Sequence, residues 1–248
     1  MRVTEITNKQ NMSDLLICLA HFCDKHGPRV LMVTQCATDN DQCQELLLPD
    51  YPTDSYCESC LIHFPESSEV RSMRSTIGST YYVSTQYSSI RYQLLTSITK
   101  RTFSEETMTY DGTPLVFYDD MRGCNFVIGF KLQDVNARGS ERRYCLILTI
   151  DSRDNQRAMS QLSQNWEFIV SGFAKIIEYT RQKRAEEISK RQRQEFSTHG
   201  NNLTPMVGNY LRGSNLKIPK NLTELTSDSR FFLRLHKWNA FMLDRLNR

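Results

Sequence analysis

Two apolar runs on either side of a short polar segment constrain the fold more than any other feature. The first run covers residues 15–20 and the second covers residues 30–33. Between them stand Asp24, Gly27 and Pro28, which favour a turn because glycine tolerates positive φ and proline fixes φ and favours an extended residue before it. The sequence therefore predicts a β-hairpin over about residues 14–36.

Length and composition allow one large domain or two small ones. The chain has 248 residues, of which 39% are hydrophobic, and a formal net charge of +3. This charge is too small to indicate a nucleic-acid partner. No apolar run approaches the ~18–20 residues that span a bilayer, and residues 1–5 lack the apolar core of a signal peptide, so we expect a cytoplasmic protein.

The cysteines are expected to be reduced thiols. Four of the eight lie in or at the end of strand-like runs, where a buried thiol packs as a small hydrophobe. These four are Cys18, Cys23, Cys124 and Cys145.

The middle of the chain predicts one helix followed by three strands. Ile90, Leu94, Leu95 and Ile98 repeat at helical spacing, which predicts a helix over about residues 87–104. Three β-type runs separated by polar turns then indicate an antiparallel meander. These runs are residues 114–118, 126–130 and 144–150.

Two amphipathic helices are predicted in the last third. The first should run from about residue 157 to beyond 180, since six apolar residues fit the i, i+3, i+4, i+7 template. Its continuation over 181–193 is polar and of mixed charge, which favours a solvated helix or a partner contact over lipid binding. The second covers about residues 228–247. The six apolar residues are Trp166, Ile169, Val170, Phe173, Ile176 and Ile177.

The remaining segments are polar. Residues 1–13 are predicted to be a disordered tail, and residues 37–80 a long surface loop. We expect a domain over residues 14–195 and a C-terminal extension over 196–248. The element order β-β-α-β-β-β-α predicts an α+β fold whose five-stranded antiparallel sheet is flanked by helices.

Four short motifs give the chain a resemblance to a known family. They are His21-Phe22-Cys23 with His26-Gly27-Pro28-Arg29, then Tyr56–Cys60, then Asn136–Gly139 with Arg143-Tyr144, and finally Leu222–Asp228. The chain resembles the folliculin family in its short fungal form, and the resemblance implies a longin domain. Larger family members continue into a DENN domain, which we expect to be missing here.

The resemblance also implies a function. Folliculin proteins activate GTP hydrolysis by Rag C/D-type GTPases, and the family's arginine finger falls on Arg138 of this sequence. Gly139 would give that loop its flexibility and close approach. From the residues alone, Arg138 is a solvated charge in a turn, and Ser140 stands where we expect a bulkier residue in animal relatives. The chain would therefore be a GTPase activator and not itself an enzyme.

Partners and location follow from the same resemblance. We expect a heterodimer with a folliculin-interacting-type longin/DENN protein, which acts on a Rag-family GTPase heterodimer in amino-acid signalling to TORC1. The complex would be cytoplasmic and recruited indirectly to the vacuolar or lysosomal membrane. The alternative is a non-catalytic longin adaptor in vesicle trafficking or GTPase assembly.

Cys57-X-X-Cys60 with His63 nearby has the local spacing of half a zinc site. A zinc site commonly uses two such pairs, and no second Cys-X-X-Cys exists, although Cys43 or His21 are candidates to complete it. We therefore expect no metal and favour a motif that serves packing or a partner, with zinc at Cys57 and Cys60 as the minor alternative.

The sequence shows no motif for catalysis by histidine or for binding a nucleotide. His21 and His26 flank the predicted turn without a nucleophile and an oriented acid, so we expect hydrogen-bonded structural roles for them. No segment resembles a glycine-rich phosphate loop, so we expect no bound nucleotide or other cofactor.

Overall fold

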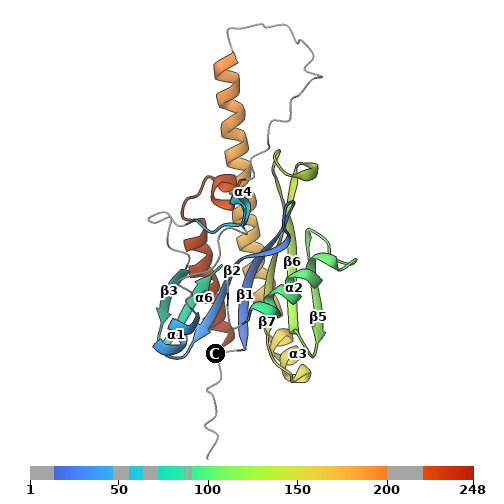
Figure 1. Ribbon diagram of the computed structural model, residues 1–248, viewed down its shortest axis with the longest axis vertical. Helices are drawn as coiled ribbons and strands as arrows, with labels where there is room; N and C mark the ends of the chain where they lie inside the picture. The colour runs from blue at the N-terminus through green and yellow to red at the C-terminus, as the bar shows by residue number, and fades with distance from the viewer. Residues whose placement is uncertain (1–13, 47–55, 64–71, 87, 89–90, 200–219) are drawn as a thin grey trace, which may run out of the picture.

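The computed structural model describes residues 14–46, 56–63, 72–86, 88, 91–199 and 220–248. Within these residues the chain forms one antiparallel sheet of seven strands, in the order β3-β4-β2-β1-β7-β6-β5 (Figure 1). The strands are β1 (Leu15–Cys23), β2 (Gly27–Ala37), β3 (Ser72–Ile77), β4 (Thr80–Thr85), β5 (Asp111–Asp119), β6 (Gly123–Gln133) and β7 (Glu141–Ile150).

The first strand lies at the centre of the sheet. β1 pairs with β2 through the predicted hairpin, and on its other side it pairs with β7, where Leu15 lies opposite Ile150. Eight of its nine residues are buried. A strand covered on both faces needs apolar residues at consecutive positions, which explains the continuous run over residues 15–20.

Three helices cover one face of the sheet. They are α3 (Asn155–Gln164), α4 (Trp166–His199) and α6 (Phe231–Leu246), and their apolar sides meet alternate strand residues such as Ile17, Phe126 and Leu148. Figure 1 shows that α4 continues past the edge of the sheet. The short helix α5 (Leu222–Thr226) packs against α4.

The opposite face carries two helices. α2 (Tyr92–Ser104) places Leu95 and Ile98 against Cys18, Val127 and Ile147. At the other side of the sheet, α1 (Asn40–Leu46) packs against residues of β2 and β4. The molecule therefore has three layers, with helices on both faces of a mixed α+β fold.

The expectation of a five-stranded sheet was wrong. The five predicted strands are present as β1, β2, β5, β6 and β7, but β3 and β4 add two more. β3 lies inside the segment 37–80 that we expected to be loop, and β4 begins at the last residue of that segment. Their hairpin turns at Gly78, whose φ of +61° suits glycine. β3 is an edge strand that is half exposed, so it has little apolar signal.

Helix ends also differ from the sequence predictions. α2 begins at Tyr92 rather than near residue 87, and the long helix is interrupted at Asn165, where α3 ends and α4 begins. The last helix runs over Phe231–Leu246, inside the predicted range.

The predicted tail 1–13 lies outside the described residues, as do residues 47–55 and 64–71 of the predicted loop and residues 200–219 of the extension. No helix in the described part of the chain is long and apolar enough to cross a membrane.

Candidate functional site around Arg138

Arg138 lies on the turn between β6 and β7. The turn contains a short 3-10 helix, η2 (Arg138–Ser140), and stands at the end of the sheet where the β1–β2 turn also lies (Figure 1). The two turns touch, because the backbone N–H of Arg138 donates to Oδ2 of Asp24 at 2.9 Å.

The backbone of this turn is fixed by local hydrogen bonds. The Asp134 carboxylate accepts from the N–H of Asn136 at 3.0 Å, and the Asp134 carbonyl accepts from the N–H of Ala137 at 3.0 Å. The Asp134 N–H donates to the carbonyl of Ser140 at 2.9 Å and closes the loop. Gly139 has a φ of +70° and Ser140 a φ of +60°, so the chain reverses through two left-handed residues.

A buried ion pair lies at the base of the turn. Oδ2 of Asp134 is 2.6 Å from Nε of Arg142, and the two side chains are only 1% and 7% exposed. Arg142 also donates to the carbonyl of Lys220 at 2.8 Å. Arg184 of α4 donates to the carbonyls of Gln133 and Leu225. These contacts tie the turn to α4 and to the chain before α5.

The guanidinium of Arg138 faces no partner group among the described residues. The side chain is exposed, and no described residue makes a hydrogen bond or ion pair with its guanidinium. Arginine is planar, always charged and weakly hydrated, so an exposed one on a fixed turn can enter a phosphate-binding pocket of another protein. Gly139 is exposed beside it, and open space surrounds the position of a Cβ there.

Sequence reasoning placed Arg138 on a turn and did not find its supports. The sequence indicates only a turn-forming role for Asp24, and for the segment of Arg184 it indicates a solvated helix or a partner contact. In the structure Arg184 is 6% exposed and Glu187 is 8% exposed, so this part of α4 is anchored to the domain. The contacts of Asp24 and of Arg184 join residues that are far apart in the chain. Only the position of Asp24 in a predicted turn indicated that it could lie near another turn.

The structure brings Cys57 and Cys60 together with two residues of the hairpin turn. Cys23 ends β1 and His26 lies in the β1–β2 turn, and both face the segment around the 3-10 helix η1 (Glu58–Cys60). Of the other residues considered for a zinc site, Cys43 and His63 lie outside the cluster, and His21 lies beside it. Cys43 is buried in α1, and Nε2 of His63 is 2.7 Å from a carboxylate oxygen of Glu58. The cluster and the Arg138 turn share a pocket of about 220 Å³, lined among others by Cys23, Asp24, Cys57 and Arg142.

His21 is a buried neighbour of the cluster. Its Nε2 is 3.3 Å from Sγ of Cys60, and its ring stacks on Tyr144 at 5.9 Å between centroids. Burial lowers the pKa of His21 to about 3, so the imidazole is neutral near pH 7.

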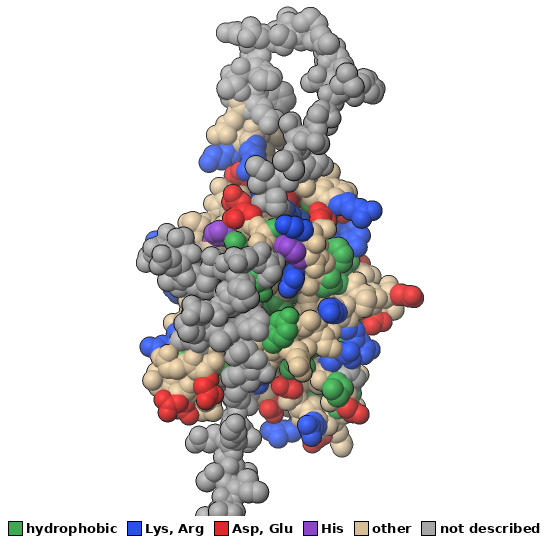
Figure 2. All heavy atoms as spheres, in the orientation of Figure 1, with side chains coloured by type: hydrophobic (Ala, Val, Ile, Leu, Met, Phe, Trp, Pro, Cys, Tyr) green, Lys and Arg blue, Asp and Glu red, His purple; other side chains and the backbone are tan. Residues whose placement is uncertain are grey.

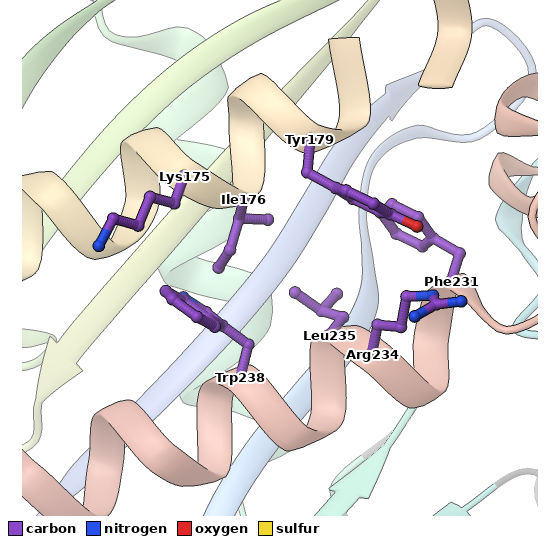
Figure 3. A pocket seen from close by; sticks show the side chains of 7 residues that line it. All are labelled: Lys175, Ile176, Tyr179, Phe231, Arg234, Leu235 and Trp238. Carbon is purple, nitrogen blue, oxygen red and sulfur yellow. The ribbon is translucent and has the colours of Figure 1, made fainter. Parts of the chain in front are cut away.

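A second concave feature lies between α4 and α6, away from the Arg138 turn. Figure 3 shows Ile176, Leu235 and Trp238 pointing into it, with Tyr179 and Phe231 at one end. The groove has a volume of about 270 Å³. Figure 2 shows Lys and Arg side chains interspersed with Asp and Glu on the visible face, so the described residues there form no continuous basic surface.

Comparison with known proteins decides the family. A family model named Folliculin, described as a vesicle coat protein involved in Golgi to plasma membrane transport, matches residues 80–246. The yeast protein LST7 of Saccharomyces cerevisiae is 54% identical over 233 residues, which cover 94% of this chain and 96% of that protein. The chain belongs to the folliculin family. The match to the folliculin model includes Arg138 and its supports Asp134, Arg142 and Arg184, and it begins after the cysteine cluster.

Proposed function

We propose that this folliculin-family chain is a subunit of a GTPase-activating complex that acts on a Rag C/D-type small GTPase. Arg138 supplies the arginine finger in trans. One observation carries the proposal: Arg138 is exposed, its guanidinium has no hydrogen-bond or ion-pair partner among the described residues, and its turn is held by Asp24 and by the buried pair Asp134–Arg142. Family membership supports the choice of a GTPase as the target.

The chemistry of the proposed role requires a fixed backbone and a free side chain. During GTP hydrolysis negative charge develops on the phosphate oxygens, and an arginine finger neutralises it. The Asp24 contact and the Asp134 hydrogen bonds hold the backbone in advance, so little ordering cost is left for the moment of contact. The chain regulates another protein's reaction and binds no cofactor for it.

The proposal includes a partner and a location. The α+β domain acts as a longin domain that pairs with the longin domain of a folliculin-interacting-type longin/DENN protein, through sheet edges or helices. The heterodimer acts on a Rag-family GTPase heterodimer at the vacuolar or lysosomal membrane, where amino-acid supply is coupled to TORC1. Recruitment to that membrane is indirect, through the complex.

The test is single-turnover GTP hydrolysis by the Rag-type heterodimer with this chain and its partner. Arg138→Ala is expected to bind the GTPase and to lose about 10³-fold or more of the stimulated rate, since a finger supplied in trans is typically worth 10³–10⁵. Arg138→Lys should also fail, because an ammonium does not reproduce the planar guanidinium.

Arg157→Ala is the matched control. Arg157 is an exposed arginine of α3, near the opposite end of β6 and β7, so its loss should leave the rate unchanged (Figure 1). Equal stimulation by the wild type and Arg138→Ala would contradict the finger assignment.

A non-catalytic adaptor is the second candidate. The description of the matching family in vesicle transport and the apolar groove between α4 and α6 favour it. An adaptor would bind its assembly without stimulating hydrolysis, and it would tolerate Arg138→Ala. The same experiment therefore separates the two candidates.

A further inference from the structure

We propose that Cys23, His26, Cys57 and Cys60 bind one Zn²⁺ ion as a structural site. Each of the four offers one ligand atom, and these atoms all lie within 4.8 Å of one another. Cys23 and Cys60 are buried, while His26 and Cys57 are half-buried. The proposal concerns metal binding alone and does not depend on the proposed GTPase role.

The distances between the ligand atoms fit a tetrahedron around zinc. Bond lengths of about 2.3 Å to sulfur and 2.0–2.1 Å to nitrogen place tetrahedral ligands about 3.8 Å apart for two sulfurs and about 3.6 Å apart for sulfur and nitrogen. Sγ of Cys57 lies 3.5 Å from Sγ of Cys23 and 3.7 Å from Sγ of Cys60. Nδ1 of His26 lies 3.6 Å from Sγ of Cys23 and 3.5 Å from Sγ of Cys60. Four of the six distances between ligand atoms therefore match those of a tetrahedral zinc site.

The spacing along the chain is also that of a zinc site. Cys23-X-X-His26 comes from the β1–β2 turn, and Cys57-X-X-Cys60 wraps around η1, where the N–H of Cys60 donates to the carbonyl of Cys57 at 2.8 Å. Two such pairs make a Cys₃His set, and three thiolates with one imidazole favour zinc over magnesium or calcium. Four protein ligands leave no open position, which indicates a structural role.

Neighbouring polar groups suit thiolates better than packed thiols. Ser59 Oγ is 3.0 Å from Sγ of Cys57 and 3.8 Å from Sγ of Cys23, and Nε2 of His21 is 3.3 Å from Sγ of Cys60. Hydrogen bonds of this kind to metal-bound sulfur orient the ligands and stabilise their charge. A cluster that served only hydrophobic packing would not turn three sulfurs and a ring nitrogen toward one point.

A disulfide explains the cluster less well. The sulfur separations of 3.5 and 3.7 Å exceed the ~2.0 Å of an S–S bond. One bond would also leave the third cysteine and the histidine without a role. Zinc binding involves all four, with the thiols giving up their protons to solvent.

The site would fix the turn that supports Arg138. Asp24 stands between the ligands Cys23 and His26, and its carboxylate accepts the N–H of Arg138. On the other side, Glu58 stands between Cys57 and Cys60 and accepts from Nδ2 of Asn221 at 3.0 Å. A metal ion here would hold together the hairpin turn, the segment around η1 and the N-terminus of α5.

The decisive experiment measures metal in the full-length chain purified without a histidine tag. Elemental mass spectrometry should find about one zinc per chain, and Cys57→Ser or Cys60→Ser should reduce it at least tenfold. Co²⁺ added after chelation should give the visible absorption of a tetrahedral thiolate site. His26→Ala should lose the metal, whereas His26→Cys should keep it, because a thiolate can replace the imidazole ligand.

His63→Gln and Cys43→Ser are the matched controls and should keep the zinc, since neither side chain belongs to the cluster. If a ligand variant fails to fold, the wild-type measurement still decides. Wild-type chain with less than about a tenth of an equivalent of zinc and no Co²⁺ uptake would overturn the proposal. Zinc retained by His26→Ala and Cys57→Ser alike would overturn the ligand assignment. None of these readouts depends on GTP hydrolysis.

Discussion

His236 of α6 is a buried histidine whose two ring nitrogens both face serine hydroxyls. Nδ1 lies 2.7 Å from Oγ of Ser84 in β4, and Nε2 lies 2.9 Å from Oγ of Ser75 in β3. Burial, with a smaller effect of the neighbouring Lys237, lowers the pKa of His236 to about 4. The neutral ring therefore joins the C-terminal helix to the edge of the sheet.

This histidine should make stability depend on pH. Its pKa is about 6.5 in the unfolded chain and about 4 in the folded one, so between these values the unfolded state binds more protons. The contribution of the neutral His236 to the free energy of unfolding is thus fully present above pH 6.5 and is lost as the pH falls toward 4. At pH 5 the loss is about 2 kcal/mol. Urea unfolding of the wild type and of His236→Gln at pH 7 and pH 5 measures this. The variant should lose less stability than the wild type over that range. Equal losses in the wild type and in His236→Gln would contradict the assignment.

The ion pair between Asp134 and Arg142 is a second feature at the residue scale, and breaking it should lower the free energy of unfolding. Asp134→Ala leaves the buried Arg142 without its carboxylate partner, and such a change costs about 3–5 kcal/mol. The pair Lys131–Glu141 at the ends of β6 and β7 beside the same turn provides the control, because its side chains are 41% and 49% exposed. Glu141→Ala should cost no more than about 1 kcal/mol. Urea unfolding compares the two variants, and a similar loss in both would show that burial does not govern this pair.

Among the elements, the strands that could be predicted are those that carry a run of consecutive apolar residues. β1 and β7 carry continuous apolar runs, and such runs predict buried strands. β3 reads Ser-Met-Arg-Ser-Thr-Ile and has no buried residue, and an edge strand of this kind differs little from a loop in composition. The break between α3 and α4 was equally hidden, because helical periodicity continues across Asn165.

The C-terminal helix should prove essential to the core. Phe232 of α6 is fully buried and meets Phe231 edge to face at 5.5 Å between centroids, whereas Phe241 of the same helix is 45% exposed. Phe232→Ala should cost about 3–5 kcal/mol, because a cavity remains that the sheet and helix cannot fill. Phe241→Ala should cost about 1 kcal/mol or less. Thermal or urea unfolding of both variants tests this, and equal stability would mean that α6 is not part of the cooperative unit.

For the whole molecule, the sequence predicts local patterns well and the meeting of distant segments poorly. The residues around Arg138 predict a turn, but only the fold shows that the backbone N–H of Arg138 donates to Asp24. The Cys57-X-X-Cys60 pair was visible, and its complement Cys23-X-X-His26 was present 34 residues earlier. Nothing local says which of several cysteines and histidines will converge, since that depends on how the intervening chain packs.

The central position of β1 has a consequence for how the protein is made. Synthesis proceeds from the N-terminus, so the β1–β2 hairpin leaves the ribosome long before β7, to which β1 pairs from Leu15 opposite Ile150. Until that strand emerges, the apolar strand β1 has an open edge, and such edges recruit other chains. Newly made chains should therefore need chaperone protection for as long as translation takes to reach residue 150.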